Sequence, residues 1–417
     1  MFPWQDILLL IFRGTLGVFF EPMFWMILAL VSYQYWQLQR TQIKLFGVYG
    51  FTLRKQIMLA VIYGCLGGMI GSFLLTVVGV TLNQLGLKYI WPVAFLLMMI
   101  NMRFLCFAYA GGLVAISSTV LGWPEVNVPQ VLTLVAILHI TEAILIFISG
   151  RYSSVPLILK QQDGRIVGAF NLQNFWPLPL VLLGVVPIAG TEAPTGIIKM
   201  PEWWPILKMA MEPPEGYTWL YGMLPVVAAL GYTDMAITSL PATRRRSSAI
   251  HLAGYSIVLL VMALLSAKYH WLQIFAAVLS PLGHEFLIQR DNKHENQGIP
   301  RFVPPEQGVM ILDTVPDSPA RKIDLRPGDI ILKLGGMTVN GSYELANAIS
   351  FAENQFSLEI KRDGQVLQQE TRFVNGERRL GVILVPEGYE ENYMEMVTER
   401  FGLFDYLASK WRRLKGR

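Results

Sequence analysis

The residues of this chain that could do chemistry are a few ionisable side chains inside long apolar segments. His139 and Glu142 lie three positions apart in one such segment, which places them on one face if the segment is helical. His284 and Glu285 are adjacent near the end of another segment, and Asp234 lies late in a third. Ionisable groups inside a membrane are costly, so they are candidates for functional sites.

Three interpretations of these polar residues stay open. Because histidine and carboxylate side chains are zinc ligands, His139, Glu142, His284 and Glu285 could meet around a metal ion. The same groups could instead bind another polar ligand. They could also form structural hydrogen bonds, because side chains near the ends of a span reach the membrane surface.

The sequence motifs of hydrolases are absent. His284-Glu285 begins the H-E-x-x-H motif of zinc proteases, but Ile288 stands where the second histidine is required. No G-x-S-x-G motif occurs either. The two cysteines, Cys65 and Cys106, both lie in apolar segments without C-x-x-C spacing, and we expect packed thiols. We therefore predict no catalytic residue, no metal and no cofactor.

The composition indicates a membrane protein. Hydrophobic residues make up 53% of the chain and charged residues 15%, whereas soluble proteins carry about 25% charged residues. The mean hydropathy is +0.42, and the apolar excess fills residues 1–289. A net charge of +4 without a basic, aromatic-rich patch does not predict nucleic-acid binding. The first apolar segment lacks a basic start and a cleavage site, so we expect it to be retained.

The predicted fold of residues 1–289 is an α-helical polytopic membrane domain with about nine spans, each of about 20 apolar residues. The predicted spans are 16–37, 57–80, 86–102, 104–122, 130–149, 177–197, 218–240, 248–267 and 269–289. The pair around Arg103 is also compatible with a re-entrant hairpin, and residues 1–14 with a helix in the interface. Small-residue spacing in the second span (Gly64, Gly67, Gly68 and Gly71) predicts close helix packing.

Charge in the short loops predicts the orientation. Lys and Arg are found in 38–56, 150–175 and 241–247 and after residue 289, whereas 123–129 has neither. Because cytoplasmic loops are enriched in Lys and Arg, an odd number of spans puts the N-terminus outside and the C-terminal part in the cytoplasm. We therefore expect a multi-pass protein of the plasma membrane.

Two further segments have patterns of their own. Residues 154–171 predict a cytoplasmic β-hairpin, because Asp163-Gly164 separates two apolar strands, and Pro156 suggests that the first is an edge strand. Residues 390–417 predict an amphipathic helix with a basic end, which suits the inner leaflet. Packing of this helix on its own domain is the alternative.

Residues 300–388 differ from the rest of the chain, because their apolar residues come in short runs between turns. The sequences Val-Pro-Asp-Ser-Pro-Ala at 315–320 and Leu-Arg-Pro-Gly-Asp-Ile-Ile at 325–331 are the most specific features. This pattern resembles bacterial PDZ domains, which are small α+β domains. The resemblance implies that 300–388 binds the end of an extended peptide as an added strand.

The order of elements resembles the circularly permuted PDZ domains of bacterial membrane proteases, because the φ-G-φ element comes last. The implied peptide groove would be formed by that element and by the wall of a predicted helix at 342–353. Its residues are Arg379, Leu380, Gly381, Val382, Ile383 and Leu384, with Tyr343, Ala346 and Ile349 on the helix. A domain that only packs against the membrane region is the alternative.

Many spans followed by one PDZ domain resemble the MinJ-like family of cell-division topology proteins of Gram-positive bacteria. The residues that carry this resemblance are Gly17–Trp25, Tyr35-Trp36 and Ser280–Glu285, together with the PDZ pattern. The resemblance implies a non-enzymatic scaffold whose cytoplasmic PDZ domain recruits protein partners. Proteins that place the cell-division machinery are the partners that this family suggests. A membrane metalloprotease-like enzyme with a degenerate site and a transporter with a regulatory PDZ domain are the alternatives.

Overall fold

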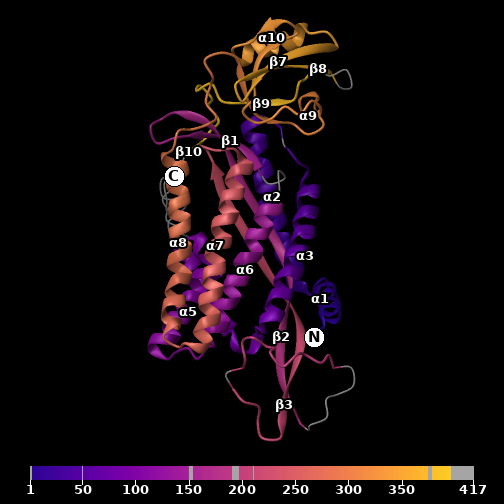
Figure 1. Cartoon of the computed structure of the whole chain (residues 1–417). Helices are drawn as coiled ribbons and strands as arrows, with labels where there is room; N and C mark the ends of the chain where they lie inside the picture. Colours follow the sequence, from indigo (N-terminus) through magenta and orange to yellow (C-terminus); the bar gives the residue numbers. More distant parts are fainter. Residues whose placement is uncertain are drawn as a thin grey trace, which may run out of the picture.

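Long helices lie side by side in the N-terminal part of the molecule, and a small mixed domain covers one end of them (Figure 1). The computed structural model describes residues 2–48, 50–149, 154–189, 197–209, 211–373 and 378–395. Its N-terminal helices are α1 (Trp4–Val18), α2 (Pro22–Phe46), α3 (Leu53–Val78), α4 (Leu87–Ile100), α5 (Phe107–Leu121), α6 (Val128–Ile148), α7 (Pro241–Lys268) and α8 (Leu272–Gln297).

Helix α6 is the centre of this arrangement, and most of its residues are buried. Asn127 caps its N-terminus, and the Asn127 side chain accepts a hydrogen bond from Gln130 N (3.2 Å). Within the described ranges, α3, α6 and α7 are long and apolar enough to cross a membrane, and the bent pair α1–α2 would add a fourth if it is one span. Helices α4 and α5 are shorter, at 14 and 15 residues.

Two of the predicted helical spans, 177–197 and 218–240, are wrong. The chain there forms a long antiparallel pair of strands, β2 (Ile166–Ala189) and β3 (Tyr217–Ala236), in register from Phe170↔Ala236 to Ala189↔Tyr217. Prolines are the physical reason, because a proline inside a helix removes a hydrogen bond and clashes with the preceding turn. They stand at Pro177, Pro179 and Pro187 in β2 and at Pro225 in β3.

The predicted hairpin at 154–171 is present as β1 (Ser154–Lys160) and the first part of β2. Asp163 and Gly164 both have positive φ, at 47° and 88°, as a tight two-residue turn requires. Strand β2 then continues past β1 along the helices, and β2 and β3 extend beyond them at the end far from the mixed domain (Figure 1).

The glycines of α3 face two neighbours: Gly67 approaches Leu145 of α6, as predicted for helix packing, whereas Gly64 and Gly68 approach β2. A Cβ atom on Gly64 would lie 2.1 Å from Pro177 O, and one on Gly68 would lie 2.3 Å from Pro179 O. Glycine at both positions therefore lets the backbone of β2 approach the helix closely.

The edge of β2 that faces the helices has partners for its backbone groups. Three of its N–H groups donate to side chains: Phe175 N to Tyr35 Oη (3.2 Å), Val181 N to Ser72 Oγ (2.8 Å) and Val185 N to Asn83 Oδ1 (3.0 Å). Pro177, Pro179 and Pro187 occupy positions of the same parity and have no N–H to satisfy. An unpaired N–H in an apolar environment costs several kcal/mol, on the order of a lost hydrogen bond, so these partners allow a strand edge at membrane depth.

The mixed domain at the other end contains most of the elements predicted for 300–388. They are β4 (Val309–Thr314), α9 (Pro319–Lys322), β5 (Ile330–Leu334), β6 (Met337–Thr338), α10 (Ser342–Phe351), β7 (Gln355–Arg362), β8 (Gln365–Arg372) and β9 (Val382–Leu384). The sheet order is β8-β7-β5-β4-β9, with β6 beside β5. Arg362 donates to both carboxylate oxygens of buried Asp329 (2.7 and 2.6 Å), and these hydrogen bonds raise the pKa of Arg362.

The predicted helix at 390–417 is only partly testable, because 396–417 lies outside the described residues. Its first described residues are not helical. Met394 and Glu395 form β10, which pairs in parallel with Leu159 and Lys160 of β1. The helix prediction is therefore wrong at Met394 and Glu395.

The mixed domain is docked on the β1–β2 hairpin. Gly168 N donates to Phe302 O (2.9 Å), and the rings of Phe170 and Phe302 are 5.3 Å apart in a T-shaped contact. Leu312 of β4 and Ile383 of β9 belong to the same buried cluster as Phe170 and Phe302. One face of the small sheet therefore packs on the strand that continues along the helices.

Substitution of Gly64 tests the close approach of α3 and β2. We expect Gly64→Ala to lower the free energy of unfolding by about 1–3 kcal/mol, because the new Cβ overlaps with Pro177 O. Gly254→Ala on α7 is the matched control, since a Cβ there meets nothing within 4 Å. Thermal unfolding of the purified full chain in detergent measures both, and equal stability of the two variants would contradict the packing.

Candidate functional sites: a peptide groove and two polar clusters

Helix α10 lies alongside β9 and runs in the opposite direction. After β9, Glu387 Oε1 accepts a hydrogen bond from Ser342 N (2.6 Å) at the start of α10. Before β9, the Arg378 guanidinium donates to Ser350 O near the end of the helix. Burial acts to raise the pKa of Glu387, but hydrogen bonds from Tyr389 and Ser342 outweigh it and hold this pKa below its ordinary value. These contacts fix the helix against the chain on both sides of β9.

The residues predicted for the groove do not all face α10. Val382 and Leu384 are half-buried and pack against the core of the mixed domain, as does Ile349 of α10. Ile383 faces the other way, in the cluster with Phe170, as expected for the alternation of side chains along a strand. Leu380 belongs to the domain core, with 1% of its surface exposed.

The remaining predicted wall residues are open to solvent. Tyr343 is 77% exposed, and Ala346, one turn further along α10, is also exposed. Arg379 is exposed at the start of the φ-G-φ element. An extended ligand beside β9 would therefore meet apolar side chains from the strand and a partly aromatic helix wall.

The conformation of Gly381 explains the Ser-Pro-Ala sequence. Its φ of 76° lies in the left-handed region, and a Cβ atom there would lie 2.2 Å from Ser318 Cβ. The carbonyls of Leu380 and Gly381 accept hydrogen bonds from Ala320 N (3.0 Å) and Val315 N (2.9 Å). The 315–320 turn therefore holds the φ-G-φ element in place, and a side chain at 381 would disrupt the turn itself.

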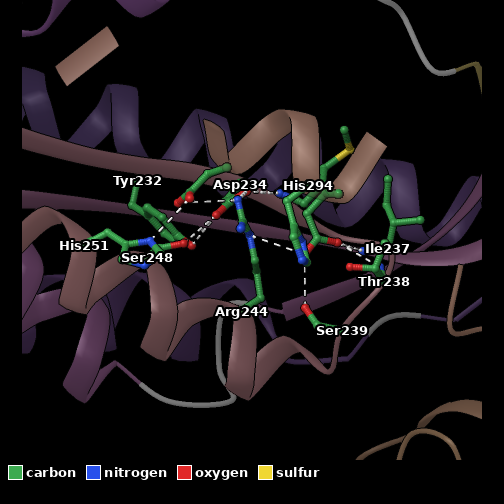
Figure 2. A network of polar contacts seen from close by, with 12 residues as sticks. Tyr232, Asp234, Ile237, Thr238, Ser239, Arg244, Ser248, His251 and His294 are labelled. Carbon is green, nitrogen blue, oxygen red and sulfur yellow. Dashed lines mark hydrogen bonds and ion pairs between the residues drawn. The ribbon is translucent and has the colours of Figure 1, made fainter. Parts of the chain in front are cut away.

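A buried polar network surrounds Asp234, one of the residues predicted as intramembrane candidates (Figure 2). Asp234 lies on β3, near the end that joins α7. Its carboxylate accepts hydrogen bonds from Tyr232 Oη (3.0 Å), Ser248 Oγ (2.8 Å) and Arg244 Nη2 (2.9 Å). Arg244, expected in a basic loop, is instead 5% exposed in the first turns of α7. This supports a structural role for Asp234.

The same network includes Glu295 near the end of α8. Its Oε2 accepts hydrogen bonds from Ile237 N and Thr238 N, both at 2.8 Å, and its Oε1 lies 3.8 Å from Arg244 Nε. Figure 2 shows Asp234, Arg244 and Ile237 of this network close together. The network therefore joins the end of β3, the start of α7 and the end of α8 below the mixed domain. No sequence motif marks Glu295, because its partners are backbone groups more than fifty positions away.

The second cluster contains two of the predicted candidates and one cysteine. His139 of α6 and His284 of α8 are brought together, with ring centroids 5.0 Å apart. Cys106, expected to be a packed thiol, precedes α5 and lies between them, with Sγ 3.1 Å from His139 Nε2 and 3.9 Å from His284 Nε2. Within the described part of the chain, these three residues are the one group of ligand-type side chains close enough to hold a metal ion.

The predicted carboxylates lie outside that group. Glu285 accepts hydrogen bonds from Tyr109 Oη (2.6 Å) and Arg103 Nη2 (2.9 Å). Tyr109 in turn lies 3.3 Å from His284 Nδ1. Glu142 is one turn along α6 from His139 and is not part of the group. The predicted four-residue set is therefore replaced by a set with one cysteine and two histidines.

The apolar helices and the mixed domain define a membrane protein that carries a PDZ domain, and comparison with known proteins agrees with this. A family model of the PDZ domain matches residues 287–372. Over a longer stretch, the chain is similar to MinJ proteins. It is 25% identical over 265 residues to the "Cell division topological determinant MinJ" of Bacillus subtilis, and the match covers 63% of each chain.

Two other relatives show how far the similarity extends. The "Probable cell division topological determinant MinJ" of Lacticaseibacillus paracasei is 27% identical over 272 residues, which cover 63% of this chain and 67% of that one. "Serine protease HTRA1" of Xenopus tropicalis is 30% identical over 79 residues, only 19% of this chain and 17% of that one. The protease relatives match at the PDZ domain only.

The Arg244 network gives a stability prediction. We expect Glu295→Gln to lower the free energy of unfolding by about 3 kcal/mol. The substitution removes the negative charge that faces buried Arg244, and it replaces the carboxylate that accepts hydrogen bonds from two backbone N–H groups. Glu306→Gln, at an exposed position, is the matched control. Chemical or thermal unfolding of the full chain measures both, and a Glu295→Gln variant as stable as its control would show that the network contributes little.

Proposed function

We propose that this protein is a multi-pass scaffold of the plasma membrane, and that its cytoplasmic PDZ domain recruits protein partners that place the cell-division machinery. The names of the MinJ relatives support a role in cell division, and the PDZ domain supports protein binding. The observation that carries the proposal is that α10 is bonded to the chain on both sides of the outermost strand β9, while Tyr343 and Ala346 on α10 are exposed.

The groove would bind an extended peptide by adding a strand. In a permuted PDZ domain, the peptide lies between β9 and α10, and backbone N–H groups of the φ-G-φ element at 380–382 hold its terminal carboxylate. Val382, Leu384 and Ile349 would then form the pocket for the last side chain of the peptide. Ile383 would stay on the membrane-region side, so binding and docking use opposite faces of one strand.

The charge of the loops supports the cytoplasmic placement. Lys44 lies in the last turn of α2, and Lys55, in the first turn of α3, lines a cleft together with Val315 and Pro316 of the mixed domain. The basic start of α7 and the end of α8 also lie at this end of the helices (Figure 1). Loops rich in Lys and Arg favour the cytoplasmic side. Strand β2 leads away from the mixed domain and its antiparallel partner β3 leads back, as two helical spans would. Replacing two predicted helices by two strands therefore does not alter this orientation.

A block of the groove tests the proposal. We expect Ala346→Trp to weaken capture of division proteins at least about tenfold when the full chain is crosslinked in native membranes and its partners are identified, because the indole fills the space between α10 and β9. Gln368→Trp is the control, since Gln368 is exposed on β8 at the opposite edge of the sheet. A variant at Gly381 is unsuitable, because any side chain there collides with Ser318.

A second measurement separates groove binding from loss of folding. C-terminal peptides of the captured proteins would be titrated against the purified chain with a free or an amidated C-terminus. We expect the amidated peptides to bind at least about tenfold more weakly, because the φ-G-φ element recognises a carboxylate. Equal binding of both forms, or an unchanged partner set for Ala346→Trp, would contradict the groove.

A further inference from the structure

The cluster of Cys106, His139 and His284 has the composition and spacing of a metal site. Their three ligand atoms all lie within 4.8 Å of one another. A tetrahedral zinc ion with one sulfur and two nitrogen ligands separates these atoms by about 3.3–3.8 Å. The observed separations of 3.1 and 3.9 Å from Cys106 Sγ to the two Nε2 atoms are close to that range. We propose that Cys106, His139 and His284 bind a transition-metal ion of the zinc type.

The hydrogen bonds of the two histidines direct the same ring atom toward the centre. His139 Nδ1 lies 2.7 Å from Val135 O, and a carbonyl only accepts, so Nδ1 carries the proton. Tyr109 donates its hydroxyl proton to Glu285 (2.6 Å), so its oxygen is free to accept from His284 Nδ1 at 3.3 Å. Metal-bound histidines in proteins are held by such bonds from the second ring nitrogen.

These tautomers leave two Nε2 lone pairs facing one thiol. A thiol has a single proton and can satisfy only one of them. His139 is 2% exposed, so water does not readily replace the missing partner. A metal ion resolves this mismatch, because it accepts both lone pairs and bonds to the thiolate, while the thiol proton passes to solvent.

The donor set selects the class of metal. One thiolate and two imidazoles suit zinc and its neighbours among the transition metals, whereas Mg²⁺ and Ca²⁺ require oxygen ligands. Three protein ligands leave a fourth position for water. Glu285, which also accepts a hydrogen bond from Arg103, holds the Tyr109 hydroxyl that faces His284.

The site would hold together three elements that are far apart in the sequence. Cys106 lies at the start of α5, His139 on the central α6, and His284 on α8, which leads into the PDZ domain. A bound ion would therefore stabilise the helix arrangement on which the PDZ domain rests. This role goes beyond the proposed scaffold function and does not depend on the groove.

Metal content of the full chain, purified in detergent without added chelator, tests the site. We expect about one zinc-type ion per chain in the wild type, and at least about tenfold less in Cys106→Ser and His284→Gln. The matched controls are Cys65→Ser and His270→Gln, which change the other cysteine and an exposed histidine and should keep the ion. Zn²⁺ should raise the melting temperature of the wild type and the controls only.

Cobalt provides a readout that a general loss of folding would not imitate. After removal of the native metal, Co²⁺ bound to Cys106 should give a thiolate-to-metal charge-transfer band that survives in Cys65→Ser and disappears in Cys106→Ser. The metal-free melting temperatures of Cys106→Ser and wild type should agree, which shows that the variant is folded. The proposal is overturned if the wild type neither contains nor takes up such an ion, or if Cys65→Ser loses it equally.

Discussion

A strand edge beside membrane helices must have a partner for every backbone N–H, and much of this structure follows from that constraint. The edge of β2 is lined by proline, which has no N–H, and by residues whose N–H groups donate to Tyr35, Ser72 and Asn83. The hydroxyl of Ser72 can reach Val181 because glycines on the same face of α3 let the strand approach. The glycines of α3 and the prolines of β2 therefore both allow the strand to lie close to the helix.

The same strand connects the membrane region to the PDZ domain. β2 begins in the hairpin on which β4 and β9 pack, and it then runs along α3 and α6. The Asp234–Arg244–Glu295 network fixes the end of its partner β3 to α7 and α8. The PDZ domain is therefore supported by strands and helices together, while Tyr343 and Ala346 on α10 are exposed.

Sequence reasoning found the elements whose patterns are local. The Asp163-Gly164 turn, the apolar helices α3, α6 and α7 and the PDZ turns at 315–331 all depend on neighbouring residues. Residues 177–197 and 218–240 were predicted as helices because a long apolar run does not by itself distinguish a buried strand from a helix. Pro177 and Pro179, two positions apart, are the feature that favours a strand, since alternate residues of a strand share an edge.

The sites were predicted less completely, because they form from residues that are distant in sequence. The sequence predicts His139 and His284 as candidates but Cys106 only as a packed thiol, since no spacing rule links a cysteine to histidines on two other helices. Arg244 was assigned to a basic loop, although buried Asp234 and Glu295 neutralise it. Ile383 was placed in the groove, whereas alternation along β9 turns it toward Phe170.

The rest of the structure depends on the pairing of β2 with β3, and disulfide formation tests the register of this pair most directly. Leu183 and Met223 are directly opposite in the pair, within the range of separations that a disulfide spans. In a Cys65→Ser background, the pair Leu183→Cys with Met223→Cys should form a disulfide under mild oxidation, identified by peptide mass mapping. Leu183→Cys with Leu224→Cys, shifted by one residue to the opposite face, should not. Efficient pairing of both, or of neither, would contradict the strand register and favour two helical spans.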